Sequence, residues 1–177
     1  MKTILVIEDE TSVRANILTI LQAEGYATLE AANGREGVRL AMQHLPDLVI
    51  ADIMMPELDG FGVLRELRSS SATGLIPFLF LSARADKSDI REGMKLGADD
   101  YLTKPFRMKE LLEAVEVRLQ KREQVTSHLV NTLETLRKNL IHSLPHEFLT
   151  PMTSILGCSK ILVESYDTLR KDDIQEM

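Results

Sequence analysis

Short apolar runs alternate with helical patterns five times in this sequence, and no other feature limits the possible fold as strongly. The apolar runs occupy residues 3–7, 27–31, 48–51, 77–81 and 100–103. Helical patterns follow from about residue 12, at 34–44, at 60–69, at 88–96 and from about residue 107. A strand followed by a helix, repeated in this way, predicts a parallel sheet with helices on both faces. We therefore expect an α/β fold whose doubly wound parallel sheet has five strands.

Polar side chains follow four of these apolar runs. Glu8 and Asp9 follow the first, Asp52 the third, Ser82 the fourth and Lys104 the fifth. In a doubly wound fold, the carboxyl ends of the strands meet at the edge where ligands bind. Clustered carboxylates need a cation, and their oxygens suit Mg²⁺. The sequence therefore predicts Mg²⁺-dependent phosphoryl transfer to Asp52, in which Lys104 neutralises charge and Ser82 donates a hydrogen bond.

These motifs resemble the receiver domains of response regulators over residues 1 to about 120. The similarity rests on Glu8-Asp9, on the nine residues from Asp52 to Gly60, on Ser82-Ala83 and on Lys104-Pro105. It implies a flavodoxin-like sheet with strand order 2-1-3-4-5. It also implies that Asp52 is the phosphorylation site. By the same resemblance, Mg²⁺ is bound by Asp9, Asp52 and the backbone carbonyl of Met54, with Glu8 acting largely through water.

The resemblance assigns two further features. Ser82 and Tyr101 match the switch pair of the family, and the Lys104-Pro105 peptide bond matches one that is usually cis. Tyr101 could equally be a half-buried packing residue on a short strand. The main alternative function is a dimerisation scaffold with a little-used acidic pocket. A flavin site is a weaker alternative, because an acidic crevice would repel the flavin phosphate.

Residues 106–144 contain neither Gly nor Pro, which indicates a long helix. Apolar residues recur in it at spacings of three and four, namely Leu112, Val115, Leu119, Leu129, Leu133, Leu136 and Leu140. Arg122 and Thr126 fall in the same register and interrupt this apolar series. This pattern predicts a parallel dimeric coiled coil through residues 107–144. A helix that packs only on its own sheet would explain the series up to Leu119 but not the leucines from Leu129 onward.

The segment from His146 to Pro151 resembles the phospho-acceptor box of sensor histidine kinases. The resemblance implies that His146 accepts the phosphoryl group, that Glu147 is its general base and that Thr150 aids the reverse, phosphatase-like reaction. His146 could instead be an ordinary surface residue, or could chelate a metal with His142 four positions earlier. Pro145 argues against that second alternative, because it removes an amide donor and disfavours helical geometry at Leu144, which would allow a bend between the coiled coil and the bundle helix.

The sequence thus divides into a receiver domain at 1–120, a coiled-coil linker at 107–144 and part of a histidine-kinase helical bundle at 145–177. Because residues 1–177 contain no GxxxxGK[ST] loop or ATP-binding domain, we expect a truncated hybrid protein capable only of aspartyl phosphotransfer. Its expected partners are a histidine kinase or phosphotransfer protein as donor and a second copy of the chain. The net charge of −6 and the absence of a basic stripe or long apolar stretch argue against nucleic-acid and membrane binding. The single cysteine suggests the cytoplasm.

Overall fold

The computed structural model describes the backbone of residues 1–83 and 93–175, and their side chains except those of 140–150 and 164–175. Two compact units divide the chain, Met1–Val125 and Thr126–Met177. The first unit contains a five-stranded parallel sheet of order β2-β1-β3-β4-β5, which confirms the predicted fold class. Its strands are β1 (Thr3–Ile7), β2 (Ala27–Ala31), β3 (Leu48–Asp52), β4 (Phe78–Ser82) and β5 (Asp100–Thr103).

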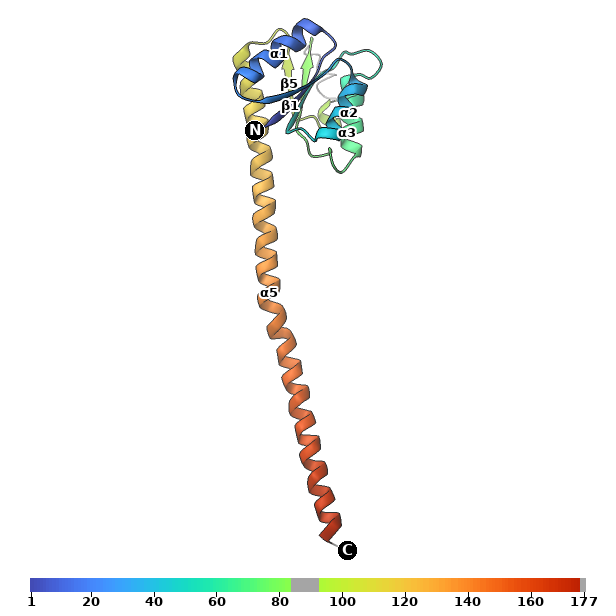
Figure 1. Ribbon diagram of the computed structural model, residues 1–177, viewed down its shortest axis with the longest axis vertical. Coiled ribbons are helices and arrows are strands. Elements are labelled where there is room, and N and C mark those ends of the chain that lie inside the picture. Colours follow the sequence, from blue (N-terminus) through green and yellow to red (C-terminus); the bar gives the residue numbers. More distant parts are fainter. Residues whose placement is uncertain (84–92, 176–177) are drawn as a thin grey trace. The chain divides into compact units, whose positions relative to one another are not determined.

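Helices cover both faces of this sheet (Figure 1). The helix α1 (Thr11–Ala23) and the first turns of α5 (Met108–Gln175) pack on one face, and α2 (Gly34–His44) and α3 (Gly60–Ser69) pack on the other. Successive strand residues alternate between the faces, so that Ile4 joins the cluster of α1 and α5 whereas Leu5 joins that of α2 and α3. Because both faces are buried, the strands appear in the sequence as continuous apolar runs.

Side-chain caps fix the starts of the two helices that follow β2 and β3. The side chain of Asn33 accepts a hydrogen bond from the backbone N–H of Glu36 at 2.9 Å at the start of α2. Asp59 accepts one from the N–H of Gly62 at 2.7 Å at the start of α3. Each cap satisfies a donor that the first helical turn leaves without an intrahelical partner.

The C-terminal end of α2 contains a locally strained residue. Leu45 adopts the left-handed conformation, with φ 48° and ψ 60°, and its side chain is half exposed. Glycine adopts this conformation without the steric cost that a Cβ atom imposes. We expect Leu45→Gly to raise the free energy of unfolding by about 0.5–1 kcal/mol in a urea titration. A loss of stability would show that apolar contacts of Leu45 outweigh its backbone strain.

The fourth helix was expected over residues 88–96, and most of that range lies outside the described residues. Residues 93–96 are described and are helical. Gly97, the next residue after this helical segment, has a φ of 89°. This left-handed conformation is the one that commonly terminates helices at glycine.

The helix α5 corrects the predicted start of the coiled coil. Leu111, Val115 and Leu119 are buried in the core of the first unit, so Val115 and Leu119 are not available to a second chain. Leu112 is only partly buried, and Leu111, which the predicted seam left out, faces the core in its place. The exposed apolar face of the described helix, which includes Leu129, Leu133 and Leu136, begins after this packed segment.

Arg122 is an anchor of α5, whereas the sequence suggested only a polar break in an apolar seam. Its guanidinium donates a hydrogen bond to the carbonyl oxygen of Pro46 at 3.0 Å and lies 3.6 Å from a carboxylate oxygen of Asp47. Lys2 lies 3.7 Å from the same Asp47 carboxylate and 3.0 Å from that of Glu123. These contacts hold α5 to the first unit as far as residue 123.

The second unit continues the same helix. The helix α5 runs through Leu144 and Pro145 and extends to Gln175, although the proline removes one backbone donor. The single cysteine, Cys158, is exposed in the single chain. Among the described residues, no helix combines the length and apolar character needed to cross a bilayer.

Candidate functional site

Three carboxylates from two neighbouring strands meet at the carboxyl edge of the sheet. Glu8 and Asp9 follow β1, and Asp52 is the last residue of β3, which pairs with β1 in the sheet. One carboxylate oxygen from each of the three lies within 4.8 Å of the others. Glu8 and Asp52 are buried, whereas Asp9 is exposed. The structure therefore brings together the acidic residues that the sequence placed at these strand ends.

Lys104 places an ammonium group against two of these carboxylates. It follows β5, and its Nζ lies 2.6 Å from Glu8 Oε2 and 3.2 Å from Asp52 Oδ1. Its backbone N–H donates to the carbonyl oxygen of Ser82 at 2.7 Å, which aligns the ends of β4 and β5. The Lys104-Pro105 peptide bond is cis, as the resemblance implied. A single ammonium thus bridges two carboxylates in the site.

The electrostatics of the site favour uptake of a further cation. Burial raises the pKa of the Glu8 carboxyl, and the hydrogen bond from Lys104 only partly opposes this effect. Burial also raises the pKa of Asp52, opposed by Lys104 and reinforced by the charge of Asp9. Burial lowers the pKa of Lys104, but the hydrogen bond to Glu8 and the charge of Asp52 outweigh it, so the pKa is raised overall. One ammonium does not fully compensate three carboxylates.

These raised pKa values predict an unusual dependence of stability on pH. The folded chain binds more protons at Glu8 and Asp52 than the unfolded chain does. Their contribution to stability is therefore complete below the ordinary carboxyl pKa of about 4 and is lost as the pH rises through the raised values. Urea unfolding without metal should show that the wild type loses stability from pH 5 to pH 7 relative to the Glu8→Gln, Asp52→Asn double variant. A stability difference independent of pH would contradict the two raised pKa values.

Mg²⁺ fits the chemistry of this donor set. The three clustered carboxylates supply hard oxygen ligands, and Mg²⁺ binds through one or two carboxylates while it keeps several waters. Met54 lies two residues beyond β3, with its side chain exposed. The contribution of its backbone carbonyl to metal binding stays a prediction. Gly60 lies against the backbone of Asp52, where a Cβ atom would collide with the Asp52 carbonyl oxygen, so this glycine permits the close turn beside the site.

Ser82 and Tyr101, the predicted switch pair, lie on the neighbouring strands β4 and β5. Ser82 is buried at the end of β4. Tyr101 on β5 stacks on Phe80, with ring centroids 5.2 Å apart and an interplanar angle of 28°. A Cβ atom at Gly93 would collide with the Tyr101 hydroxyl, so the ring points inward toward the helical residues 93–96. Tyr101 is therefore a packing residue in this structure, and its role in switching stays a prediction.

The predicted phospho-acceptor residues of the second unit are His146, Glu147 and Thr150. All three lie within α5, and their side chains are outside the described part of the structure. His142 lies in the same segment. Their proposed chemistry therefore rests on the sequence alone.

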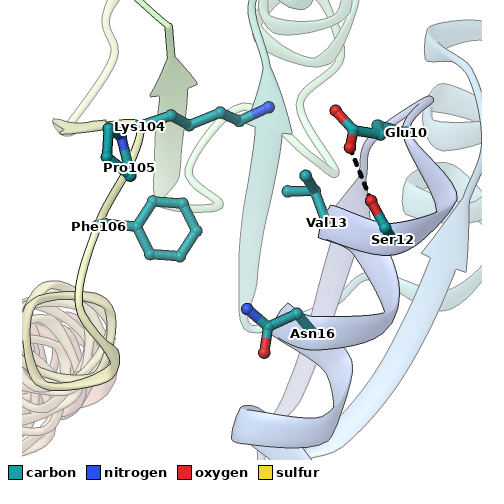
Figure 2. Close-up of a pocket in the computed structure, with 7 residues that line it drawn as sticks. All are labelled: Glu10, Ser12, Val13, Asn16, Lys104, Pro105 and Phe106. Carbon is teal, nitrogen blue, oxygen red and sulfur yellow. Dashed lines mark hydrogen bonds between the residues drawn. The ribbon is translucent and has the colours of Figure 1, made fainter.

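The structure adds two features that the sequence analysis did not single out. Arg14 on α1 donates a hydrogen bond to the carbonyl oxygen of Glu8 at 2.6 Å. The sequence indicated this contact only by placing an arginine six residues after Glu8, within the predicted first helix. A cleft of about 500 Å³ also opens beside Lys104 (Figure 2). It lies between the start of α1 and the segment after β5, and is lined by Glu10, Ser12, Val13, Asn16, Lys104, Pro105 and Phe106.

A family model described as the response regulator receiver domain matches residues 4–116. The chain belongs to the response regulator receiver family. Receiver domains accept a phosphoryl group on an aspartate from histidine kinases in two-component systems, with Mg²⁺ in an acidic pocket. The cluster of Glu8, Asp9 and Asp52 is an acidic pocket of this receiver type.

Solved receiver structures agree with this assignment. The receiver domain of the sensor histidine kinase PA1611 from Pseudomonas aeruginosa, solved with magnesium in its active-site cleft, has 30% identity and a TM-score of 0.64. The similarity covers 67% of this chain and 98% of that structure. The receiver domain of a signal transduction histidine kinase from Syntrophus aciditrophicus has 35% identity, a TM-score of 0.64 and coverage of 68% and 92%, respectively.

Curated relatives of this receiver chain are transcriptional regulators. The probable transcriptional regulator ycf27 of Cyanophora paradoxa is 42% identical over 139 residues, which cover 78% of this chain and 56% of the relative. The DNA-binding dual master transcriptional regulator RpaA of Synechocystis is 35% identical over 148 residues, with coverage of 84% and 61%. The chain spans about half the length of the curated relatives it matches.

Proposed function

We propose that Asp52 is the phosphoryl acceptor of this receiver and that Lys104 and Ser82 assist the transfer. The observation that carries the proposal is the close cluster of three carboxylate oxygens bridged by one ammonium. In this cluster the ammonium of Lys104 lies 2.6 Å from Glu8 and 3.2 Å from Asp52, so it binds Glu8 more closely than Asp52. Asp52 also ends β3, where its side chain faces the edge at which ligands of this fold class bind.

The proposed transfer is a displacement at phosphorus. A carboxylate oxygen of Asp52 forms a bond to phosphorus, and the bond to the nitrogen of the donor imidazole breaks, with its electron pair leaving on that nitrogen. Lys104 meets one phosphoryl oxygen as a point charge, and Ser82 donates a hydrogen bond to another. Bound Mg²⁺, held by Asp9, Asp52 and the carbonyl of Met54, would neutralise phosphoryl charge.

We further propose that the output of the receiver passes along α5 to a histidine-kinase phospho-acceptor region. Residues 107–144 act as a linker, and residues 145–177 carry His146 as acceptor, with Glu147 as its base and Thr150 assisting the reverse reaction. The sequence from His146 to Pro151 supports this output over the DNA binding named for RpaA. Two of the similar solved receivers come from histidine kinases, which is consistent with a receiver and a histidine-kinase region in one protein.

The proposed signal begins at the acidic pocket. Phosphorylation adds negative charge beside Lys104 and Ser82, and such a local charge change can shift the equilibrium of a two-state element. Tyr101 lies on β5, which pairs with the strand that ends at Ser82. We propose that Tyr101 moves together with Ser82. Arg118 of α5 is bonded to Asp100, the neighbour of Tyr101, at 2.7 Å. This ion pair supplies a physical connection from β5 to the output helix.

The proposed linker should form a homodimer through its exposed leucines. Leu129, Leu133 and Leu136 lie at spacings of four and three and are each more than half exposed in the single chain. We expect Leu133→Glu to convert a dimer into a monomer in sedimentation equilibrium, because it places charge in the apolar seam. Asn131→Glu, which adds the same charge away from the seam, should leave the dimer intact. A wild-type chain that remains monomeric at tens of micromolar would contradict the dimeric linker.

One measurement separates phosphorelay from the scaffold alternative. Beryllofluoride with Mg²⁺ imitates a phosphorylated carboxylate, so it should bind the wild-type pocket and change the amide spectrum around Ser82 and Tyr101. A scaffold with an unused pocket would show neither binding nor a spectral response. Asp52→Asn, which lacks the carboxylate that beryllium requires, is the matched control.

A further inference from the structure

The turn between β1 and α1 carries two of the three clustered carboxylates, yet it lacks the usual helix cap. Glu10 is at the N-cap position of α1, and its side chain makes no capping hydrogen bond. By contrast, Asn33 and Asp59 cap the two helices that follow β2 and β3. Other contacts must therefore hold the backbone of residues 8–10, because the position of Asp9 depends on that backbone.

Arg14 supplies contacts of this kind from the first turns of α1. One guanidinium nitrogen donates to the carbonyl oxygen of Glu8 at 2.6 Å and lies 3.5 Å from that of Asp9. The Nε of Arg14 donates to Glu30, next to the end of β2, at 3.2 Å. The Arg14 side chain is only 13% exposed, whereas that of Glu30 is 62% exposed. The guanidinium is thus largely covered, and its short hydrogen bond is to the main chain of the acidic turn.

Glu8 completes this arrangement from inside the turn. Its Oε1 accepts a hydrogen bond from the backbone N–H of Glu10 at 3.3 Å, while its Oε2 bonds Lys104. Its own N–H donates to the carbonyl oxygen of Ala31 at 3.1 Å, which continues the pairing of β1 with β2. The backbone on either side of Asp9 is consequently fixed by Arg14 at one carbonyl and by the Glu8 carboxylate at one amide.

We propose that Arg14 is a positioning residue for the metal pocket, which holds the main chain of Glu8 and Asp9 so that their carboxylates converge with that of Asp52. This inference deepens the proposed function, since it assumes that the pocket binds Mg²⁺. Arginine suits the role because its planar fork reaches a carbonyl and a carboxylate at once, whereas lysine presents a single point charge. Groups that orient metal ligands typically change metal affinity by tenfold or more when they are lost.

Charge alone predicts the opposite effect, which makes the inference testable. Removing a positive charge near a cation site reduces repulsion and should tighten Mg²⁺ binding. Loss of a positioning contact should weaken it. We expect Arg14→Ala to raise the Mg²⁺ dissociation constant about tenfold in isothermal titration calorimetry. Arg14→Lys keeps the charge but loses the fork and should raise the constant at least about threefold.

A second readout concerns the metal-free protein. If Arg14 holds the turn, the backbone amide hydrogen of Glu10 should exchange with solvent faster in both Arg14 variants. The increase should be larger than the change in the global free energy of unfolding accounts for. Arg39→Ala is the matched control, because Arg39 is an exposed residue of α2 whose recorded contacts are to Gln43 and Glu36. It should leave both the Mg²⁺ affinity and this exchange rate unchanged.

The outcomes separate the two levels of the argument. If wild-type protein fails to bind Mg²⁺, the proposed function fails. If wild type binds Mg²⁺ and either Arg14 variant binds it as tightly or more tightly, the positioning role of Arg14 is overturned and the proposed function stands. Should Arg14→Ala fail to fold, Arg14→Lys decides by the same criterion. Equal weakening by Arg39→Ala would also overturn the inference, because it would show that the loss of affinity does not depend on the contacts of Arg14.

Discussion

Asp52→Asn should reduce phosphoryl labelling of the chain by at least about 10³-fold, the scale on which loss of a covalent nucleophile acts. The amide cannot supply the carboxylate oxygen that attacks phosphorus, while the size of the side chain is nearly unchanged. The measurement is incubation with acetyl phosphate and Mg²⁺, followed by mass mapping of the modified residue. Labelling of wild type should require Mg²⁺ and should map to Asp52.

Asp59→Asn is the matched control for this substitution. Asp59 lies in the loop that follows Asp52 and caps α3 through the N–H of Gly62, and asparagine caps helices about as well as aspartate. This variant should fold and accept label normally. Without metal, Asp52→Asn should also be more stable than wild type at neutral pH, because it removes a buried carboxylate whose pKa is raised by burial. Persistent labelling of Asp52→Asn would refute the assignment of the acceptor.

The sheet and its site were predictable because both depend on local sequence features. Each strand of a doubly covered parallel sheet must be apolar on both sides, so runs such as residues 3–7 identify the strands directly. The polar residues that follow these runs then meet at one edge by topology alone. The convergence of Glu8, Asp9 and Asp52 therefore follows from strand positions. The pairing of Lys104 with buried Glu8 does not, because it depends on side-chain geometry across 96 residues of chain.

The long helix was harder to predict because one periodic pattern serves two different surfaces. Leucines at spacings of three and four indicate an apolar face but not what covers it. Here the sheet covers the face through Leu119, with Leu111 more deeply buried than Leu112, whereas Leu129, Leu133 and Leu136 are exposed. Arg122 has the register of an interface residue and instead bonds the carbonyl of Pro46. Such contacts depend on tertiary structure that periodicity does not encode.

Pro145 illustrates a second limit of local reasoning. Its ring removes one hydrogen bond and disfavours helical geometry at Leu144, which suggested a bend between the linker and the bundle helix. In the structure, helix continues on both sides of this residue within the single element α5. The loss of one donor is a local cost, and many intact turns flank it. Propensity at one position is therefore a weaker guide than the pattern of a whole segment.

Lys104→Met should lower the free energy of unfolding by about 3 kcal/mol at pH 7 without metal, because it leaves two buried carboxylates without their cation. Glu8 is 1% exposed and lies 2.6 Å from the ammonium, so its charge loses both its hydrogen bond and its counterion. The loss should be smaller at pH 5, where the carboxyls more readily take up protons. Urea titrations at the two pH values measure both effects, and Lys109→Met, which removes an exposed ammonium, should change stability little.

Added Mg²⁺ should restore the stability of the Lys104→Met variant but not its phosphoryl transfer. With Lys104 gone, the vacated carboxylates attract the metal more strongly, so added Mg²⁺ should restore stability by more than it adds to the wild type. Phosphoryl labelling should nevertheless remain reduced, because no ammonium meets the phosphoryl oxygen. The combination Lys104→Met, Glu8→Gln should regain part of the lost stability at pH 7, since it removes one of the two orphaned charges. Stability loss equal in the single and double variants would show that Lys104 acts through packing and not through its bridge to Glu8 and Asp52.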